Sequence, residues 1–531
     1  MAETVSPRSA LTSASAETGG ARLWRALREA GVRAVYGDAD RGLPVTARVP
    51  ARLAPTLVAA HERVHRDRAA SWVDGVLTIG GAAAASGVPG SAGVTGTSGA
   101  AGPSGAAGPV LGGAPDGWQV LLDEPDRVSD LVAMAAHAAA TGRGVALRVD
   151  LDLDRPAPDR RAVTPGAAAS GAAASVGPMP AGAGSGGPDP AGETEAALAL
   201  LTAAERPVVL VGPGVIAAGA VPGLHAFATA GQVGVLNTWG AKGVFTWQSP
   251  HHWATIGLQR DDFRLAGLAD ADLIVAVGLD PHESPAACWQ LAPQVTIDPA
   301  SLGTLALAWR RPPGLPEMPP LRHRLAEATQ RGWTVEAGPL PPSRVTRTYG
   351  ELAARGGLIA ADPGVAGYWV ARTVGTTVLD SVIVPGGRVP AGFAIAAALV
   401  ARIASPARPV LAVLDDPASV AGSAGSPGSA GSAAVAAGSA AATGAAERIG
   451  ELVELAASLG LPVPVEAWSD DGPAPDAVAH AARLRDAVHG ESPVVAPLRT
   501  DPHWLARMTD VAGPVVAWSQ ILPANEGSTH S

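Results

Sequence analysis

Two adjacent aspartates follow a hydrophobic segment that is predicted to be a buried β-strand. The stretch 386–417, GGRVPAGFAIAAALVARIASPARPVLAVLDDP, reads as a glycine-rich turn, a helix of small residues, a proline-bearing link and then this strand, which ends in Asp415 and Asp416. Open α/β sheets bind their ligands at the carboxyl ends of parallel strands. The layout therefore predicts that the two carboxylates lie at a ligand-binding edge.

The chain has 531 residues, which is too long for one hydrophobic core and favours about three domains. Hydrophobic residues make up 47%, and the 65 glycines and 48 prolines indicate low-complexity insertions between the cores. The formal net charge of −10 argues against binding to nucleic acid or to an anionic membrane surface.

Cys288 is the only cysteine, so a disulfide framework and a thiolate metal site are excluded. The first residues lack the apolar core of a secretory signal. The longest apolar run, Val389 to Val400, is too short to span a bilayer. We therefore expect a soluble, cytoplasmic protein.

Helical and strand-like segments alternate along the chain, which predicts an α/β protein with three doubly wound parallel-sheet domains and Gly/Ala-rich insertions. The first of these domains is expected to contain a helix from about Leu53 to Val73. The predicted segments are a disordered tail at 1–19, a first domain at 20–155 with an insertion at 81–115, a linker at 156–192, a middle domain at 193–335, a third domain at 346–520 with an insertion at 418–445, and a tail at 521–531.

Several phrases in the middle unit carry a family resemblance. AERPVVLVGPGV, WGAKGVFTWQSPHHWATIGL and LADADLIVAVGLDPHES resemble the middle domain of thiamine-diphosphate (ThDP) enzymes of the acetolactate synthase and 2-oxo-acid decarboxylase type. The order of the three units is also similar to the family's pyrimidine-binding, middle and diphosphate-binding domains.

The third unit resembles the family's diphosphate-binding domain at two segments before the aspartate pair. AADPGVAGYWVA is similar to the Asp-x-Gly segment, with Asp362 and Gly364 retained. GGRVPAGFAIAAAL resembles the glycine-rich turn and helix, which implies a cofactor-binding Gly387 and places Val389 where an apolar side chain supports the bent cofactor.

PVLAVLDDP aligns with the family's strand that ends in Gly-Asp-Gly, so the resemblance puts Asp416 at the metal-ligand position. Asp415 stands in this cofactor-binding segment in place of a glycine, adding a charge that repels a diphosphate, and Pro417 removes a backbone N–H donor. LGLPVPVEAWSDDG aligns with the strand that ends in an Asn pair, which implies Ser469 and Asp470 as further metal ligands. The alternative for Asp470 is a plain turn.

In the first unit, APTLVAAHERVHRDRAASWVDG resembles the family's His-Glu segment. The resemblance implies that Glu62 hydrogen-bonds the pyrimidine of the cofactor and so activates it. The alternative is a solvated glutamate on a charged helix.

The resemblance implies an enzyme that binds ThDP and Mg²⁺ and decarboxylates or joins a 2-oxo acid through a ThDP ylid, working as a homodimer or homotetramer. The alternative is a non-catalytic homologue with a degenerate cofactor site that serves as a scaffold or regulatory partner. FAD, which some relatives bind in the middle domain, has no specific contact in this sequence.

Other candidates for chemistry are weaker. His251 and His252 suggest a metal, but without a further ligand at suitable spacing a loop pair is favoured. ASVAGSAG lacks the strand–turn–helix setting of a nucleophilic serine. Cys288 is expected to be a buried small hydrophobe.

Overall fold

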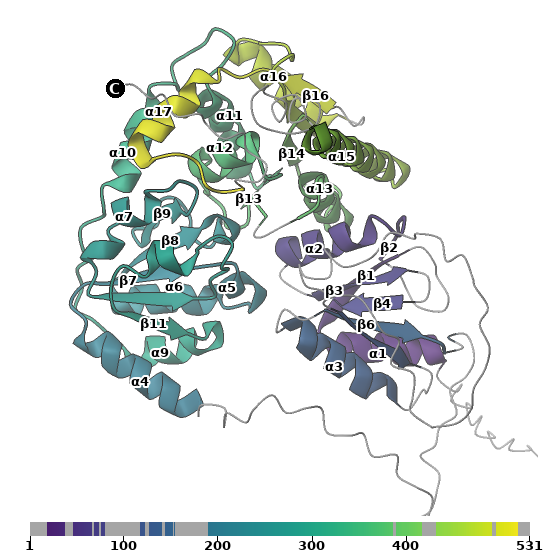
Figure 1. Ribbon diagram of the computed structural model, residues 1–531, viewed down its shortest axis with the longest axis horizontal. Helices are drawn as coiled ribbons and strands as arrows, with labels where there is room; N and C mark the ends of the chain where they lie inside the picture. Colours follow the sequence, from purple (N-terminus) through teal and green to yellow (C-terminus); the bar gives the residue numbers. More distant parts are fainter. Residues whose placement is uncertain are drawn as a thin grey trace, which may run out of the picture.

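The computed structural model describes three α/β domains. The described residues are 18–37, 46–65, 68–73, 76–79, 117–122, 127–140, 144–151, 153, 190–385, 389–416, 432–490 and 495–518. Figure 1 shows the domains in chain order as a purple and blue unit, a teal unit, and a green to yellow unit. Parallel strands dominate all three sheets, which confirms the predicted α/β class.

The first domain holds a six-stranded sheet in the order β2-β1-β3-β4-β6-β5. Its strand β4 runs antiparallel to both neighbours, whereas the other pairs are parallel. The strands are β1 (Val32–Gly37), β2 (Ala47–Arg48), β3 (Arg68–Val73), β4 (Val76–Ile79), β5 (Gly117–Leu122) and β6 (Gly144–Val149), and the helices are α1 (Gly19–Glu29), α2 (Ala54–His65) and α3 (Val128–Ala140).

The middle domain holds a five-stranded parallel sheet in the order β11-β10-β7-β8-β9. Its adjacent strands β7 and β10 are continuous apolar runs, as expected for strands of a parallel sheet that is covered on both faces. The strands are β7 (Pro207–Val211), β8 (Gly234–Thr238), β9 (His252–Ile256), β10 (Leu273–Val277) and β11 (Gln294–Ile297), and the helices are α4 (Pro190–Ala203), α5 (Gly214–Ala217), α6 (Val221–Gly231), α7 (Asp262–Leu265), α8 (Ala286–Trp289) and α9 (Leu302–Ala308).

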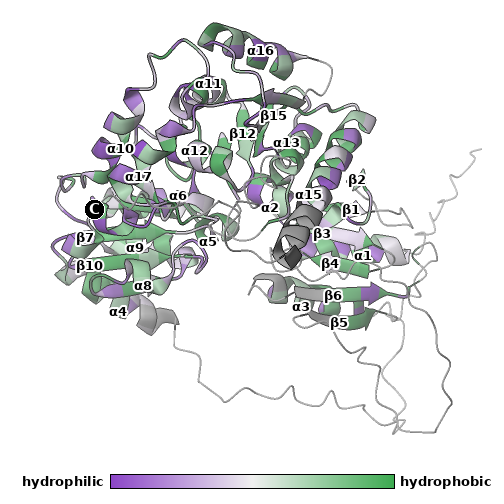
Figure 2. Cartoon of the chain, turned by 45° about the horizontal axis from the view of Figure 1, so that its top comes forward, coloured by the Kyte–Doolittle hydropathy of each residue, from purple (hydrophilic) through white to green (hydrophobic). Residues whose placement is uncertain are grey.

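Helix α10 (Leu321–Gln330) connects the middle domain to the third, which holds a parallel sheet in the order β13-β12-β14-β15-β16. In Figure 2 the hydrophobic colour follows the inner strands and α13, and α10 carries much hydrophilic colour. The strands are β12 (Leu358–Ala361), β13 (Val382–Ile383), β14 (Val410–Asp415), β15 (Val465–Trp468) and β16 (Val495–Leu498), and the helices are α11 (Pro342–Ala354), α12 (Val365–Thr373), α13 (Phe393–Ala404), α15 (Ser432–Ser458), α16 (Ala477–His489) and α17 (His503–Ala512).

Two details differ from the sequence-based expectation. The predicted helix at 53–73 ends at His65, and its last part is strand β3, because Arg68–Val73 pairs with both β1 and β4 and buries its central residues. Part of the 418–445 run is helical, since α15 begins at Ser432. The predicted insertion at 81–115 and residues 156–189 of the predicted linker lie outside the described residues.

Helix α2 joins the first domain to the third by lying alongside α13 (Figure 1). Every residue of α13 from Phe393 to Ala401 is buried, and most are alanines, which let another helix approach closely. Apolar residues of α2, including Leu57 and Val58, share one core with α13 and β14. The small-residue helix is therefore the surface on which the first domain is docked.

A buried ion pair joins the middle domain to the third. Arg372, near the end of α12, donates to both carboxylate oxygens of Asp262 at 2.9 and 2.7 Å, and the two side chains are 1% and 0% exposed. Arg372 also donates to the carbonyl of Thr255 at 2.9 Å. Nearby, the Tyr368 hydroxyl donates to Gln259 Oε1 at 2.9 Å. These bonds fix α12 against the end of β9.

Within the described part of the chain, no helix is both long and apolar enough to cross a lipid bilayer.

We predict that Arg372→Ala destabilises the docked middle and third domains by roughly 3 kcal/mol, because it leaves the Asp262 carboxylate buried without its partner. Urea unfolding followed by tryptophan fluorescence measures this change. The matched control is Arg331→Ala, which breaks an exposed pair with Glu327 and should cost less than about 1 kcal/mol. Equal losses in the two variants would contradict the role given to the buried pair.

Candidate functional site

Three neighbouring strands of the third sheet end side by side and carry most of the predicted site residues. β12, β14 and β15 are parallel and adjacent, so their carboxyl ends share one edge. Backbone hydrogen bonds between neighbouring segments continue beyond the strand ends. Asp362 N–H donates to Val413 O at 2.9 Å, and Asp416 N–H donates to Trp468 O at 2.8 Å. We call this the acidic edge; it comprises Asp362, Gly364, Asp415, Asp416, Ser469 and Asp470.

Asp362 caps helix α13. Its two carboxylate oxygens accept hydrogen bonds from the N–H groups of Gly392 and Ala394, both at 2.6 Å. Gly392 has a φ of 88°, which favours glycine at this N-cap. Burial raises the pKa of Asp362 to about 6, although the two N–H bonds favour the carboxylate. The side chain is thus a structural partner of the helix end.

Asp415 caps helix α12 in the same way. Its carboxylate accepts hydrogen bonds from the N–H groups of Val365 at 2.6 Å and Ala366 at 2.8 Å. Burial raises the pKa of Asp415 to about 6, the two N–H bonds oppose this rise, and the nearby Asp470 adds to it. These N–H groups belong to the first turn of α12 and have no acceptor within the helix.

Gly364 makes this second cap possible. A Cβ added at Gly364 would lie 2.1 Å from Asp415 Oδ2, and its φ of 144° is one that residues with side chains rarely adopt. Gly364 of the Asp-x-Gly segment therefore allows the Asp415 carboxylate to approach closely, because it has no side chain.

Asp416, Ser469 and Asp470 offer oxygen atoms next to this cap. Ser469 is 9% exposed and its N–H bonds Leu498 O at 2.9 Å, while Asp416 is half-buried and Asp470 is exposed. Oxygen donors of this kind suit Mg²⁺. Among the described residues, however, no three His, Cys, Asp or Glu side chains gather in a metal-binding group. Besides the two capping carboxylates of Asp362 and Asp415, the acidic edge supplies two carboxylates and one hydroxyl.

The remaining predicted site residues lie further from the acidic edge or outside the described residues. Val389 is half-buried and packs against the core around α13, and Gly387 is not among the described residues. Glu62 lies on α2, three residues before His65, whose Nε2 is 3.5 Å from Val400 O in the C-terminal half of α13. Glu62 is thus on the flank of α13, whereas the acidic edge is at the N-terminal end of that helix.

A second group of buried ionisable side chains lies in the middle domain, and one of its members, Lys242, also contacts the first domain. Burial lowers the pKa of Lys242 to about 7 and that of His252 to about 3, and it raises the pKa of Glu283 to about 8. Gly240 N–H donates to Glu283 Oε2 at 3.0 Å, and Arg63 of α2 donates to the Lys242 carbonyl at 2.9 Å. Such shifted groups are candidates for acid–base work.

Sequence reasoning missed this group because its members come from separate segments that only the fold brings together. It also misjudged two residues. His252 is not in a loop: it begins β9, is buried, and has Nε2 at 3.0 Å from Asn237 Oδ1. Cys288 is exposed, not buried, because α8 is a short helix on the surface of the middle domain.

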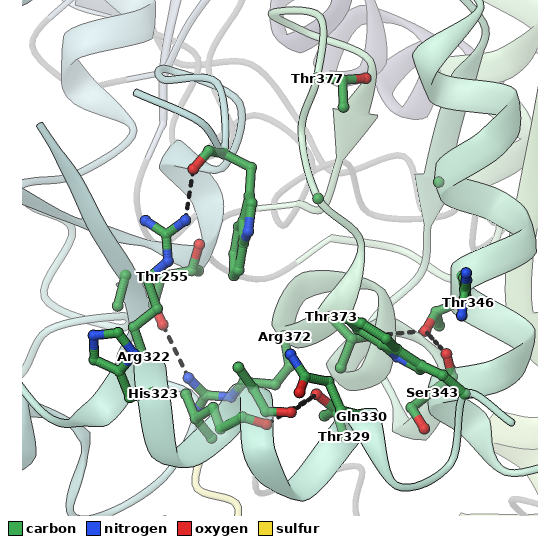
Figure 3. A pocket seen from close by; sticks show the side chains of 18 of the residues that line it. Thr255, Arg322, His323, Thr329, Gln330, Ser343, Thr346, Arg372, Thr373 and Thr377 are labelled. Atoms are coloured by element: carbon green, nitrogen blue, oxygen red, sulfur yellow. Dashed lines mark hydrogen bonds between the residues drawn. The ribbon is translucent and has the colours of Figure 1, made fainter. Parts of the chain in front are cut away.

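A cavity of about 420 Å³ lies between the middle and third domains. In Figure 3, Arg322 and His323 line one side and Ser343 and Thr346 the other. The Arg322 guanidinium stacks 4.4 Å from the centre of the Trp247 ring and donates to the Trp247 carbonyl at 2.7 Å. The volume is that of a small-molecule pocket, and no sequence motif marked it.

One segment of the chain matches the model of a known protein family. Residues 194–307 match the family model described as thiamine pyrophosphate enzyme, central domain. The matched segment runs from α4 to α9 and so covers most of the middle domain. No curated protein matches the chain. The match supports a relationship with ThDP-dependent enzymes and is silent on the substrate.

The acidic edge suits the metal ion of a ThDP–metal complex but not the diphosphate. Asp416, Ser469 and Asp470 provide oxygens that suit a divalent cation. The first N–H groups of α12, which would bind a phosphate, are held by Asp415. With the side chains as they stand, the diphosphate does not fit.

We predict that Glu283→Gln flattens the pH dependence of stability. A pKa of about 8 means that the Glu283 carboxyl stays protonated in the folded chain, whereas in the unfolded chain it loses its proton near pH 4.3. The contribution of this bound proton to the free energy of unfolding is therefore complete below about pH 4 and is lost as the pH rises through about 8. Glutamine mimics the protonated acid. Thermal midpoints between about pH 5 and pH 9 should fall less in this variant than in the wild type.

The control for this experiment is Glu327→Gln, at an exposed glutamate on α10. It should follow the wild type at every pH. Parallel curves for Glu283→Gln and the wild type would show that Glu283 does not hold its proton in the folded chain.

Proposed function

We propose that this chain is a ThDP-dependent enzyme of the acetolactate synthase type that decarboxylates or joins a 2-oxo acid. The observation that carries the proposal is the match of residues 194–307 to the central domain of thiamine pyrophosphate enzymes. The acidic edge adds support, because its oxygen donors lie at the carboxyl ends of parallel strands, where α/β sheets bind ligands.

In this proposal, Asp416, Asp470 and the Ser469 hydroxyl hold Mg²⁺ at the ends of β14 and β15. Val389, which packs against the α13 core, supports the bent cofactor from the apolar side. ThDP, when bound, supplies a nucleophilic carbon that also accepts electrons from the substrate. Binding of its diphosphate requires Asp415 to leave the end of α12.

Glu62 has the role of hydrogen-bonding the cofactor's pyrimidine. Its position on the flank of α13 leaves it away from the acidic edge of its own chain. We therefore propose a homodimer or a homotetramer, in which Glu62 of the partner subunit completes the site.

A second candidate function is a non-catalytic relative that serves as a scaffold or regulatory partner. The Asp415 cap specifically favours it, because both helix ends at the acidic edge are already satisfied by carboxylates of the chain. The two candidates differ in whether the protein binds ThDP at all.

We predict Mg²⁺-dependent binding of ThDP that Asp416→Ala weakens by about tenfold or more, because a charged metal ligand is lost. Isothermal titration of the purified chain with ThDP, with and without Mg²⁺, measures this. Asp471→Asn is the matched control, since Asp471 is exposed beside the acidic edge and should leave the affinity unchanged.

The titration is repeated in an Asp415→Ala background, where the diphosphate end is open. Absence of binding in both backgrounds, with near-UV circular dichroism showing a folded chain, would contradict the enzyme proposal and favour the scaffold. Binding that needs no Mg²⁺ would refute the assigned metal ligands.

A further inference from the structure

We propose that Asp415 is an internal occupant of an anion site at the N-terminus of α12, where it competes with a diphosphate for the N–H groups of Val365 and Ala366. The identity of the competing anion rests on the proposed function. The competition itself rests on the geometry of the acidic edge.

The contacts of Asp415 are those that a phosphate would make. Its two oxygens accept from consecutive N–H groups at 2.6 and 2.8 Å, at the positive end of a nine-residue helix. A helix N-terminus binds phosphate with the same backbone donors. The carboxylate therefore takes the place of two phosphate oxygens.

The space around the cap allows one anion and not two. Asp415 Oδ2 already lies 2.1 Å from where a Cβ of Gly364 would be, so the carboxylate fills the room that the missing side chain creates. A phosphate oxygen cannot reach the same N–H groups until the carboxylate moves away.

Charge reinforces this exclusion. The carboxylates of Asp362, Asp416 and Asp470 belong to the same acidic edge as Asp415. A diphosphate entering beside them meets repulsion that only a bound cation can offset. In the wild type, Asp415 therefore opposes diphosphate binding in two ways. It already accepts from the N–H groups of Val365 and Ala366, and its negative charge repels the diphosphate.

The test compares the binding of inorganic pyrophosphate by three variants of the full-length chain, in excess Mg²⁺, using isothermal titration. Asp415→Ala removes the cap, and we expect it to bind pyrophosphate at least about tenfold more tightly than the wild type, since two charge-assisted bonds no longer compete. Asp471→Asn removes one negative charge nearby without touching α12, so it controls for charge alone. Equal affinity in Asp415→Ala and Asp471→Asn would overturn the proposal.

Asp415→Asn keeps the side-chain shape and provides the test if the alanine variant does not fold. Its amide offers one acceptor oxygen where the carboxylate offers two, so we expect a smaller but clear gain over Asp471→Asn. No gain in a folded Asp415→Asn protein would likewise overturn the proposal.

The experiments separate the competition by Asp415 from the proposed enzyme function. A gain in pyrophosphate binding without any turnover of 2-oxo acids, in any variant, would leave the competition intact and refute the enzyme. Tight ThDP binding by the wild type, unchanged by Asp415→Ala, would refute the competition and leave the enzyme standing.

Discussion

The hydrogen bonds between an aspartate carboxylate and the first N–H groups of a helix determine how the third domain builds its acidic edge. Asp362 ties the end of β12 to α13, and Asp415 ties the end of β14 to α12. Each helix begins with donors that have no acceptor of their own, and each carboxylate loses solvation on burial. The hydrogen bonds supply the helix N–H groups with acceptors and replace the water that the carboxylates lose. The acidic edge thereby holds both helices in place.

Under the proposed function, the same arrangement would couple the stability of α12 to ligand binding. The atoms that a diphosphate would need at α12 are those that Asp415 already uses, whereas Asp416 and Ser469 follow the neighbouring strands β14 and β15. The middle domain, which matches thiamine pyrophosphate enzymes over 194–307, is fixed to α12 through Arg372 and Asp262. The helix whose N-terminus is capped is therefore also the one that anchors the family-like domain.

Sequence patterns predicted the parts of this arrangement that depend on local chemistry. The apolar run before Asp415 gave strand β14, and parallel strands brought the predicted aspartates to one edge. The patterns missed what depends on contacts between distant elements. The partner of Asp415 is 50 residues away in sequence. Likewise, Lys242 and Glu283 are buried by segments distant in sequence, as the bonds from Arg63 to the Lys242 carbonyl and from Gly240 to Glu283 show. Strand β3 was mistaken for helix because its pairing with β1 outweighs local preference.

Hydrogen–deuterium exchange of the Val365 and Ala366 amides tests the central claim most directly, because first-turn amides exchange quickly unless an acceptor outside the helix protects them. The account predicts that these amides are protected in the wild type, exchange quickly in Asp415→Ala, and become protected again when pyrophosphate and Mg²⁺ are added to that variant. Equal exchange of the two amides in the wild type and in Asp415→Ala would contradict it.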